Sequence, residues 1–422
     1  MSDTTRRVGI TCLGCGLLCD DVSVAVSNGR LTSLSPGCAL GTSWLGTGAV
    51  PDRIQSGQRD VTFESAIATA ASLLARARGR VLVYLGPGLT IEALKPAVAI
   101  ADRLHAVVDT DTSAAAASGI LAGQRRGRAA ATLGELRNRA DVVVVWGVNP
   151  ERTHPRLVER LVNATGTHAP AGRASRTVVS VRIGADGSDD GADFPFRLPA
   201  AAELAALSIL RSIVAGASVP DGAATIAGLP ELAARLVAAK YVAIVAGGED
   251  GDAARPLQRA EGLIALTQAL NGPTRAALFT LRSGDNRNGV ESLLTWQTGF
   301  PFAVDFRSGV PVYAPDARGL ADCASVDAAL ILGDWRAMPG AALAVLAGLP
   351  GIVIGPGASE APGSPRVAID TGRAGIHEGG TAYRMDDVPL PLTPALAGSR
   401  TAAMVLGALE EAVARMLREP AA

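Results

Sequence analysis

Asp141-Val142-Val143-Val144-Val145-Trp146 is the clearest strand signal in this chain. Its apolar residues do not alternate with polar ones, which indicates a strand buried on both faces, as in a parallel sheet. Similar short apolar runs occur at 81–85, 106–109, 178–183, 241–246, 328–332 and 351–354. Stretches with helical spacing of apolar residues lie between them, at 64–78, 90–104, 200–215, 230–239 and 255–270. This alternation predicts the α/β class, with parallel sheets covered by helices.

The 422 residues are enough for two or three domains, each with its own core. We expect a small Cys-rich N-terminal β segment at 1–55 and two Rossmann-like α/β units, at 56–218 and 219–422. The runs at 81–85 and 351–354 are both followed by Gly-Pro-Gly, which suggests related architecture. The stretches 284–315 and 361–391 are rich in Gly and Pro and poor in periodicity, so they are predicted as long loops. Loops of that length in a compact protein are usually functional or interfacial.

Composition and charge exclude several classes of protein. The net charge is −1 and aromatic residues make up 4% of the chain, so neither phosphate binding nor base stacking is favoured, and no nucleic-acid partner is expected. No apolar run reaches the roughly 18–20 residues that cross a bilayer, and the first residues lack the apolar core of a signal peptide. We therefore expect a cytoplasmic protein with no membrane partner.

Four of the five cysteines lie close together in the sequence, at Cys12, Cys15, Cys19 and Cys38. Four thiolates that converge can hold an iron–sulfur cluster or a tetrahedral zinc ion. Clustered cysteines in a cytoplasmic protein bind metal more often than they form disulfides. Four unrelated buried thiols are the remaining interpretation, and the residues alone leave all three open.

The turn after the strand 141–146 is a second candidate site. Gly147 would let the backbone approach a ligand, Asn149 can donate or accept a hydrogen bond, and Pro150 starts the next element. Open α/β sheets bind nucleotide-like ligands at such strand ends, although an ordinary strand-to-helix turn explains these residues equally well. The chain has no Walker A motif, no complete dinucleotide fingerprint, no HxxxH pair and no Gly-x-Ser-x-Gly elbow. It therefore contains few residues that a catalytic motif would identify.

Several of these motifs resemble a known family. The cysteine set and Trp146-Gly147-Val148-Asn149-Pro150 are similar to molybdopterin-type oxidoreductases. Two later segments resemble the B subunit of formylmethanofuran dehydrogenase more specifically. They are Trp296-Gln297-Thr298-Gly299-Phe300-Pro301-Phe302-Ala303-Val304-Asp305-Phe306 and Gly379-Gly380-Thr381-Ala382-Tyr383-Arg384-Met385-Asp386. The closer match is the bacterial relative, the B subunit of the formyltransferase/hydrolase complex of methylotrophs, and the resemblance covers about residues 8–392.

The resemblance implies a molybdopterin-oxidoreductase-like fold and, in the archaeal dehydrogenase, a tungsten or molybdenum bis-pterin with one [4Fe–4S] cluster. In that family a Cys or selenocysteine after an Asp-x-x-x-Ser lead-in binds the metal. Here the lead-in is Asp109-Thr110-Asp111-Thr112-Ser113, and Ala115 stands at the ligand position. A second departure is Pro199-Ala200-Ala201-Ala202-Glu203, where relatives have a Pro-Gly-Thr-Asp contact to the pterin nucleotide. We therefore expect no tungsten or molybdenum pterin and regard Gly147, Asn149 and Pro150 as a vestigial pterin site.

Through this resemblance, the expected function is that of a non-catalytic subunit in methylotrophic one-carbon metabolism. The complex would convert formyl-tetrahydromethanopterin to formate through a methanofuran-type carrier. The other members of the complex would be A, the zinc hydrolase, C, and D, the transferase. The family is one of oxidoreductases, but this chain is expected to lack redox catalysis, and its cysteines could hold a [4Fe–4S] cluster, zinc or nothing. The alternative is an active B subunit of formylmethanofuran dehydrogenase with both cofactors.

Overall fold

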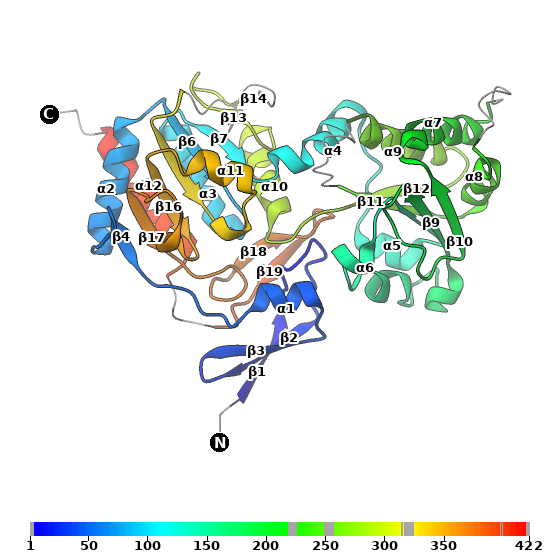
Figure 1. Ribbon diagram of the computed structural model, residues 1–422, viewed down its shortest axis with the longest axis horizontal. Coiled ribbons are helices and arrows are strands. Elements are labelled where there is room, and N and C mark those ends of the chain that lie inside the picture. The colour runs from blue at the N-terminus through cyan, green and yellow to red at the C-terminus, as the bar shows by residue number, and fades with distance from the viewer. Residues whose placement is uncertain are drawn as a thin grey trace. The chain divides into compact units, whose positions relative to one another are not determined.

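The computed structural model describes residues 4–217, 226–248, 257–313, 315, 325–396, 398 and 400–418, and the side chains of 114 and 115 are excluded. The chain forms two compact units. Unit 1 comprises residues 1–113 and 283–422, and unit 2 comprises residues 114–282. Figure 1 shows both units and labels their elements where there is room.

Unit 1 begins with a three-stranded antiparallel sheet in the order β1-β2-β3. Its strands are β1 (Thr4–Ile10), β2 (Val22–Ser27) and β3 (Arg30–Ser35). Asn28 and Gly29 turn the chain between β2 and β3 with φ values of 51° and 71°. Paired positive φ values match the twist of a tight hairpin, and Asn-Gly tolerates them. The helix α1 (Ala39–Leu45) follows β3, so the predicted N-terminal β segment is present.

The main sheet of unit 1 has nine strands in the order β14-β13-β7-β6-β15-β16-β17-β4-β5. The five central strands, β7 to β17 in that order, are parallel, and antiparallel strands extend both edges. The strands are β4 (Ile54–Ser56), β5 (Arg59–Asp60), β6 (Val81–Leu85), β7 (Val107–Thr110), β13 (Val304–Asp305), β14 (Val312–Tyr313), β15 (Ala328–Leu332), β16 (Gly351–Gly355) and β17 (Val367–Asp370). A separate hairpin is formed by β18 (Gly380–Tyr383) and β19 (Pro389–Leu392).

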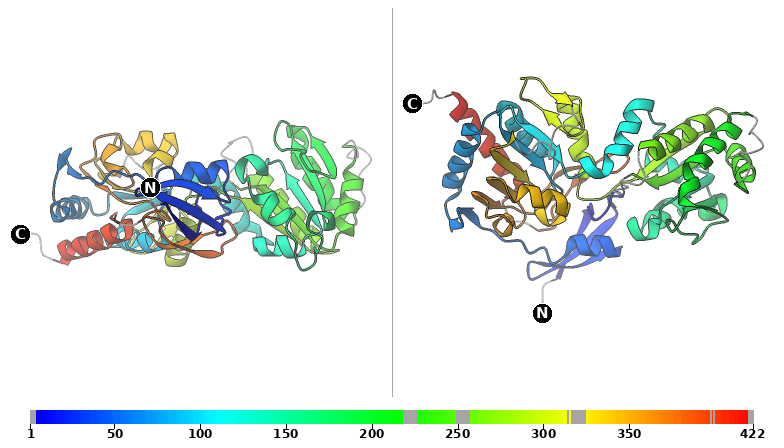
Figure 2. Two further views of the ribbon diagram at one scale, coloured as in Figure 1. Left: turned by 90° about the horizontal axis from the view of Figure 1, so that it is seen from below. Right: turned by 45° about the horizontal axis from the view of Figure 1, so that its top comes forward.

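Helices of unit 1 pack their apolar faces on this sheet. They are α2 (Phe63–Arg76), α3 (Ile91–Arg103), α10 (Arg287–Thr298), α11 (Gly340–Leu346) and α12 (Ala402–Arg418). Thr62 and Thr90 cap α2 and α3, because each hydroxyl accepts a hydrogen bond from the backbone N–H three residues on. The C-terminal helix α12 lies beside α2 and α3 (Figures 1 and 2), so both ends of the chain contribute to one core.

Unit 2 contains one parallel five-stranded sheet in the order β10-β9-β8-β11-β12. The strands are β8 (Val142–Trp146), β9 (Thr177–Ile183), β10 (Phe194–Leu198), β11 (Val242–Gly247) and β12 (Ala276–Leu281). The helices are α4 (Ser113–Arg126), α5 (Leu133–Arg139), α6 (Pro150–Thr153), α7 (Glu203–Val214), α8 (Leu229–Ala238) and α9 (Leu257–Leu270). The chain leaves β8 for β9 on one side and later returns to β11 on the other, which makes a topological switch point between β8 and β11.

The domain boundaries predicted from the sequence, 56–218 and 219–422, differ from this division. The strands β6 and β7 pair with β15–β17 from the other end of the chain, while β8–β12 form the second sheet. Unit 1 is therefore discontinuous, and unit 2 is inserted between β7 and α10. Apolar periodicity locates a strand but does not identify its neighbours, because register and partner depend on contacts distant in sequence.

The prediction of two long loops was wrong. The stretch 284–315 contains α10 and two short strands, and 361–391 contains β17, β18 and most of β19. The buried face of α10 includes the polar residues Asn288 and Glu291, which weakened its apolar pattern. Val290, Leu293 and Leu294 at helical spacing were the signal that could have identified it.

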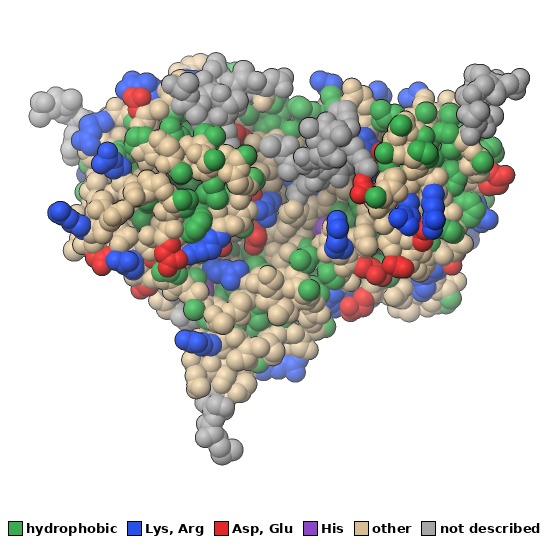
Figure 3. All heavy atoms as spheres, viewed as in Figure 1, with side chains coloured by type: hydrophobic (Ala, Val, Ile, Leu, Met, Phe, Trp, Pro, Cys, Tyr) green, Lys and Arg blue, Asp and Glu red, His purple; other side chains and the backbone are tan. Residues whose placement is uncertain are grey.

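The charge distribution is mixed. On the face drawn in Figure 3, basic and acidic side chains are interspersed, in keeping with the net charge of −1. Across the described ranges, no helix combines the length and apolar character needed to cross a membrane.

His377 provides a test of the packing beside the N-terminal sheet. Its Nδ1 accepts a hydrogen bond from the Arg373 N–H at 3.1 Å, so Nε2 carries the proton that is donated to the Gly48 carbonyl at 2.8 Å. Burial lowers the pKa of His377, because the imidazolium would lose hydration, and the positive charge of Arg373 lowers it further. The unfolded chain therefore binds a proton at His377 more readily than the folded chain does. The stability that neutral His377 contributes is lost as the pH falls below about 6.5.

We expect urea denaturation of the His377→Gln variant to show a shallower loss of stability than the wild type between pH 7 and pH 5. The introduced glutamine amide can still donate to the Gly48 carbonyl but does not titrate. If the free energy of unfolding fell as steeply with pH in the variant as in the wild type, His377 would not be the group that titrates.

Candidate functional site

The four clustered cysteines meet at one place in unit 1. Cys12, Cys15 and Cys19 lie in the loop between β1 and β2, and Cys38 is the N-cap residue of α1. The first three side chains are buried and Cys38 is half-buried. Burial raises the pKa of the Cys12 thiol to about 12, and the other three cysteines raise it further by charge repulsion. The thiols are therefore near enough to interact electrostatically.

Backbone contacts hold this cysteine loop in place. The Asp285 N–H donates to the Leu13 carbonyl at 2.8 Å, and the Met385 N–H donates to the Gly16 carbonyl at 3.0 Å. A Cβ at Gly284 would lie 2.1 Å from the Leu13 oxygen, so only glycine allows this approach. The loop is thus positioned by the segments before α10 and after β18, which supply these contacts.

The donor set suits an iron–sulfur cluster. The Gly14 N–H donates to the Cys12 sulfur and the Gly41 N–H donates to the Cys38 sulfur, each at 3.4 Å. Such N–H groups stabilise sulfur that carries negative charge as a metal ligand. Within the described residues, no three His, Cys, Asp or Glu side chains are grouped around a point that one metal ion could occupy. A single ion needs all its ligands around one point, whereas each thiolate of a cubane cluster binds a different iron atom.

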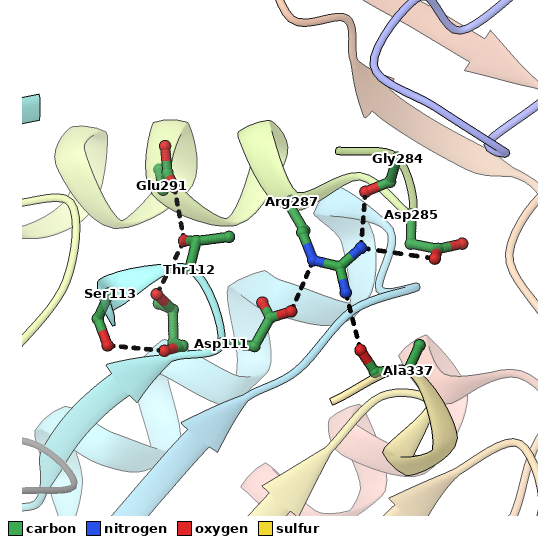
Figure 4. Close-up of polar contacts among 9 residues, drawn as sticks. Asp111, Thr112, Ser113, Gly284, Asp285, Arg287, Glu291 and Ala337 are labelled. Atoms are coloured by element: carbon green, nitrogen blue, oxygen red, sulfur yellow. Dashed lines mark hydrogen bonds and ion pairs between the residues drawn. The ribbon is translucent and has the colours of Figure 1, made fainter. Parts of the chain in front are cut away.

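The second candidate region is the carboxyl end of β7, where polar side chains from α10 and the β7 turn converge (Figure 4). Arg287 Nε donates to Asp111 Oδ2 at 2.6 Å, and the side chains are 14% and 1% exposed. Arg287 Nη2 also donates to the Ala337 carbonyl at 2.9 Å. One turn further along α10, Glu291 Oε1 accepts a hydrogen bond from the Thr112 hydroxyl at 2.5 Å. Sequence reasoning missed Arg287 and Glu291, because their segment was predicted as a loop.

These contacts hold the turn that leads to position 115. The Ser113 hydroxyl donates to the Thr110 carbonyl at 2.9 Å, and the Thr110 and Thr112 hydroxyls are 3.1 Å apart. Ala115 then falls in α4, and its side chain lies outside the described part of the structure. A methyl group has no lone pair to donate to a metal, whatever its orientation. The turn is therefore built as a rigid lead-in, but the residue that follows offers no ligand.

Gly147, Asn149 and Pro150, for which the resemblance predicts a vestigial pterin site, lie at the carboxyl end of β8, beside the switch point of unit 2. Gly147 has φ of 61°, and a Cβ there would lie 3.0 Å from Arg259 Nη2. The close approach that Gly147 permits is thus made by the chain's own Arg259. Asn149 caps α6, since its Oδ1 accepts from the Arg152 N–H at 3.3 Å, and Pro150 begins that helix.

Glu203 lies in the segment 199–203, where the resemblance predicts a pterin contact, and it accepts hydrogen bonds from two residues of unit 2. Its Oε1 accepts from Arg259 Nε at 2.8 Å and from the Trp146 indole N–H at 2.8 Å. The side chains of Glu203 and Arg259 are both 4% exposed. Arg259 is 56 residues from Glu203, so the sequence carried no local signal for this pair.

Comparisons with known proteins identify the family of this chain. No family model matches the chain. The B subunit of tungsten-containing formylmethanofuran dehydrogenase 2 from Methanocaldococcus jannaschii is 30% identical over 407 residues, which cover 91% of this chain and 92% of that protein. The chain belongs to the family of formylmethanofuran dehydrogenase B subunits. Its similarity to the B subunit of the Methylorubrum extorquens formyltransferase/hydrolase complex Fhc is 29% identity over 338 residues, covering 78% of this chain and 87% of that one.

One solved structure has the same fold as this chain. It is a chain of the formyltransferase/hydrolase complex FhcABCD from Methylorubrum extorquens, crystallised with methylofuran. The TM-score is 0.73 at 26% identity, and the match covers 86% of this chain and 99% of that one. The mixed α/β architecture with parallel sheets is therefore confirmed.

Proposed function

We propose that this chain is the non-catalytic B subunit of a formyltransferase/hydrolase complex in methylotrophic one-carbon metabolism. The observation that carries the proposal is Ala115, two residues after the lead-in Asp109–Ser113, at the position that the resemblance assigns to the metal ligand. The likeness to a chain of FhcABCD supports it. The complex would convert formyl-tetrahydromethanopterin to formate through a methanofuran-type carrier, with the A, C and D subunits as partners. We place it in the cytoplasm, and we place its two parallel-sheet units within the molybdopterin-oxidoreductase-like fold.

A tungsten or molybdenum pterin does not fit the residues present. The ligand position offers a methyl group, the space beside Gly147 is taken by Arg259, and Glu203 is engaged by Arg259 and Trp146. No reaction step of this chain is therefore assigned to such a cofactor. Its proposed role is to support the hydrolase, the A subunit, and to form a wall of the cavity through which the formyl carrier or formate moves.

A [4Fe–4S] cluster does fit, and Cys12, Cys15, Cys19 and Cys38 would hold it. When bound, such a cluster supplies one-electron transfer. The chain's own contribution is to hold the four sulfurs, to donate the Gly14 and Gly41 N–H groups to two of them, and to keep water from three of the thiols by burial. In a protein without a pterin, the cluster would act as a structural element that joins the β1–β2 loop to α1.

The alternative function is that of an active formylmethanofuran dehydrogenase B subunit. The observation in its favour is that the 30% identity to the tungsten-containing protein of Methanocaldococcus jannaschii extends over 91% of this chain. This function requires a protein ligand for the metal from a residue other than 115. It also predicts viologen-coupled oxidation of the formyl substrate by the intact complex.

The deciding experiment is metal and pterin analysis of the complex purified without oxygen. We expect no stoichiometric tungsten, molybdenum or pterin, formyl transfer and hydrolysis without viologen reduction, and ~4 iron atoms per chain. A Cys15→Ser complex should lose most of its iron and keep formate release. Stoichiometric tungsten or molybdenum would overturn the main proposal, and one zinc or no metal per chain would overturn the cluster.

A further inference from the structure

The N-terminal sheet of unit 1 has an open edge. In the order β1-β2-β3, β1 pairs with β2, and no other strand of the described residues joins it (Figure 1). The residues of β1 from Thr4 to Gly9 are all exposed, and Val8 is 71% exposed. The opposite edge is partly covered, because the Leu31 N–H of β3 donates to the Thr47 carbonyl at 3.1 Å. The backbone groups on the outer side of β1 are therefore accessible to a further strand.

The charged side chains of these three strands are all positive. The strands contain Arg6, Arg7 and Arg30 and no Asp, Glu or Lys. All three arginines are exposed, and none of them forms an ion pair with a described residue. Arg6 Nε donates to the neutral Ser23 hydroxyl at 2.9 Å. A second copy of β1 would bring arginines against arginines, whereas a strand with acidic side chains would be attracted to this edge.

A hollow on one face of the sheet reaches this edge. Arg7 of β1 lines it together with the apolar residues Val26, Val50 and Leu396, and its volume is about 420 Å³. Of the described residues that line the hollow, none is Asp or Glu. Successive side chains of a strand point to opposite faces, so Arg6 and Arg7 lie on opposite faces of the sheet. A strand paired with β1 would therefore place every second side chain on the face with the hollow, and the others on the face of Arg6.

We propose that the outer edge of β1 binds an extended, acidic segment of another subunit of the complex. The segment adds a fourth strand to the sheet, and its backbone hydrogen bonds to β1 supply the affinity. Carboxylates of the segment pair with the guanidinium groups of Arg6 and Arg7, which fixes its register on the edge. This inference rests on the proposed function, because the partner is taken from the formyltransferase/hydrolase complex.

The first experiment is amide hydrogen exchange, measured by mass spectrometry on peptides that cover β1. It compares the full chain alone with the full chain in its complex with the other purified subunits. We expect exchange in β1 to slow about tenfold or more in the complex, because amides that face water become hydrogen-bonded. Unchanged exchange in an assembled complex would overturn the docking edge and leave the proposed function standing. Slow exchange already in the chain alone would assign the edge to this chain or to a second copy, and would also overturn it.

Charge reversal tests the acidic character of the partner. Arg6→Glu and Arg7→Glu should each weaken binding of the full chain to the other purified subunits about tenfold or more, since like charges would meet at the edge. Both arginines are exposed, so urea unfolding of the chain should not change, which separates loss of binding from loss of folding.

Arg59→Glu is the matched control, because Arg59 is an exposed arginine on β5, the edge strand of the other sheet of unit 1. It makes the same change of charge and should leave the affinity within about twofold. Equal weakening by the control would reduce the effect to net charge and overturn the docking edge, and so would unchanged binding by both β1 variants. If the wild-type chain did not bind the other subunits at all, the proposed function would fail, and the docking edge with it.

Discussion

Replacing Arg287 with methionine is expected to lower the free energy of unfolding of unit 1 by about 3–5 kcal/mol. Methionine keeps most of the length of the side chain but removes the guanidinium that pairs with Asp111. The Asp111 side chain is 1% exposed, so its carboxylate would remain buried beside a thioether. The Ala337 carbonyl would lose its donor as well. Removing one partner of a buried pair leaves an uncompensated charge, which costs far more than the pair itself contributes.

The matched control is Arg53→Met in the same unit. Arg53 pairs with Asp60 at 3.0 Å, but the side chains are 54% and 67% exposed. An exposed pair contributes about 0–1 kcal/mol, so this variant should unfold nearly as the wild type does. Adding Asp111→Asn to Arg287→Met should recover part of the loss, because the buried charge is then removed.

Urea unfolding followed by separate probes measures these differences. The two units can unfold in separate transitions, so a single two-state fit to the whole chain is not appropriate. Equal small losses in Arg287→Met and Arg53→Met would mean that Asp111 is solvated or protonated in the folded protein.

Replacing Gly284 with alanine is expected to detach the cysteine loop from the turn before α10. The new Cβ would lie 2.1 Å from the Leu13 oxygen and 2.7 Å from the Cys15 nitrogen. Both are backbone atoms, so the contact is relieved only if the segments separate. Overpacking of a side chain costs about 1–3 kcal/mol, and we expect a loss at or above that range here. The Asp285–Leu13 hydrogen bond would be lost with it.

The readouts are urea stability and the iron content of anaerobically purified complex, which should fall with the loop displaced. Gly123→Ala is the control, because a Cβ at this position in α4 meets no atom within 4 Å. Alanine has a higher helix propensity than glycine, by about 1 kcal/mol, so this variant should be neutral or more stable. If Gly284→Ala kept wild-type stability and iron, the close approach of the two segments would be wrong.

The strands that the sequence predicted correctly share one property. Runs such as 81–85, 141–146 and 328–332 are short, almost wholly apolar and bounded by turn residues, and each is a central strand. The helix α10 was missed because two polar residues, Asn288 and Glu291, lie on its buried face and form hydrogen bonds that a regular apolar stripe would not provide. Functional and structural polar groups break the pattern on which prediction relies.

The candidate site, too, was predicted from the sequence only in part. The cysteine set was evident from spacing alone, and its binding of a cluster stays a prediction. The roles of Gly147 and Asn149 were not evident from the sequence. Glycine and asparagine occur equally well in a ligand-binding turn and at a helix cap. Arg259, which fills the space beside Gly147, comes from a helix more than 100 residues away.

By itself, the amino-acid sequence determined which reactive side chains this protein has: four thiols in a short segment, and an alanine rather than a cysteine at position 115. It also determined where strands form, since that depends on the local succession of apolar residues. Only the tertiary structure decided which strands share a sheet, that unit 2 is inserted into unit 1, and that Arg259 of α9 lies beside Gly147 at the end of β8. Those outcomes arise from contacts between residues far apart in the chain, and they leave no periodic signal in the segments that make them.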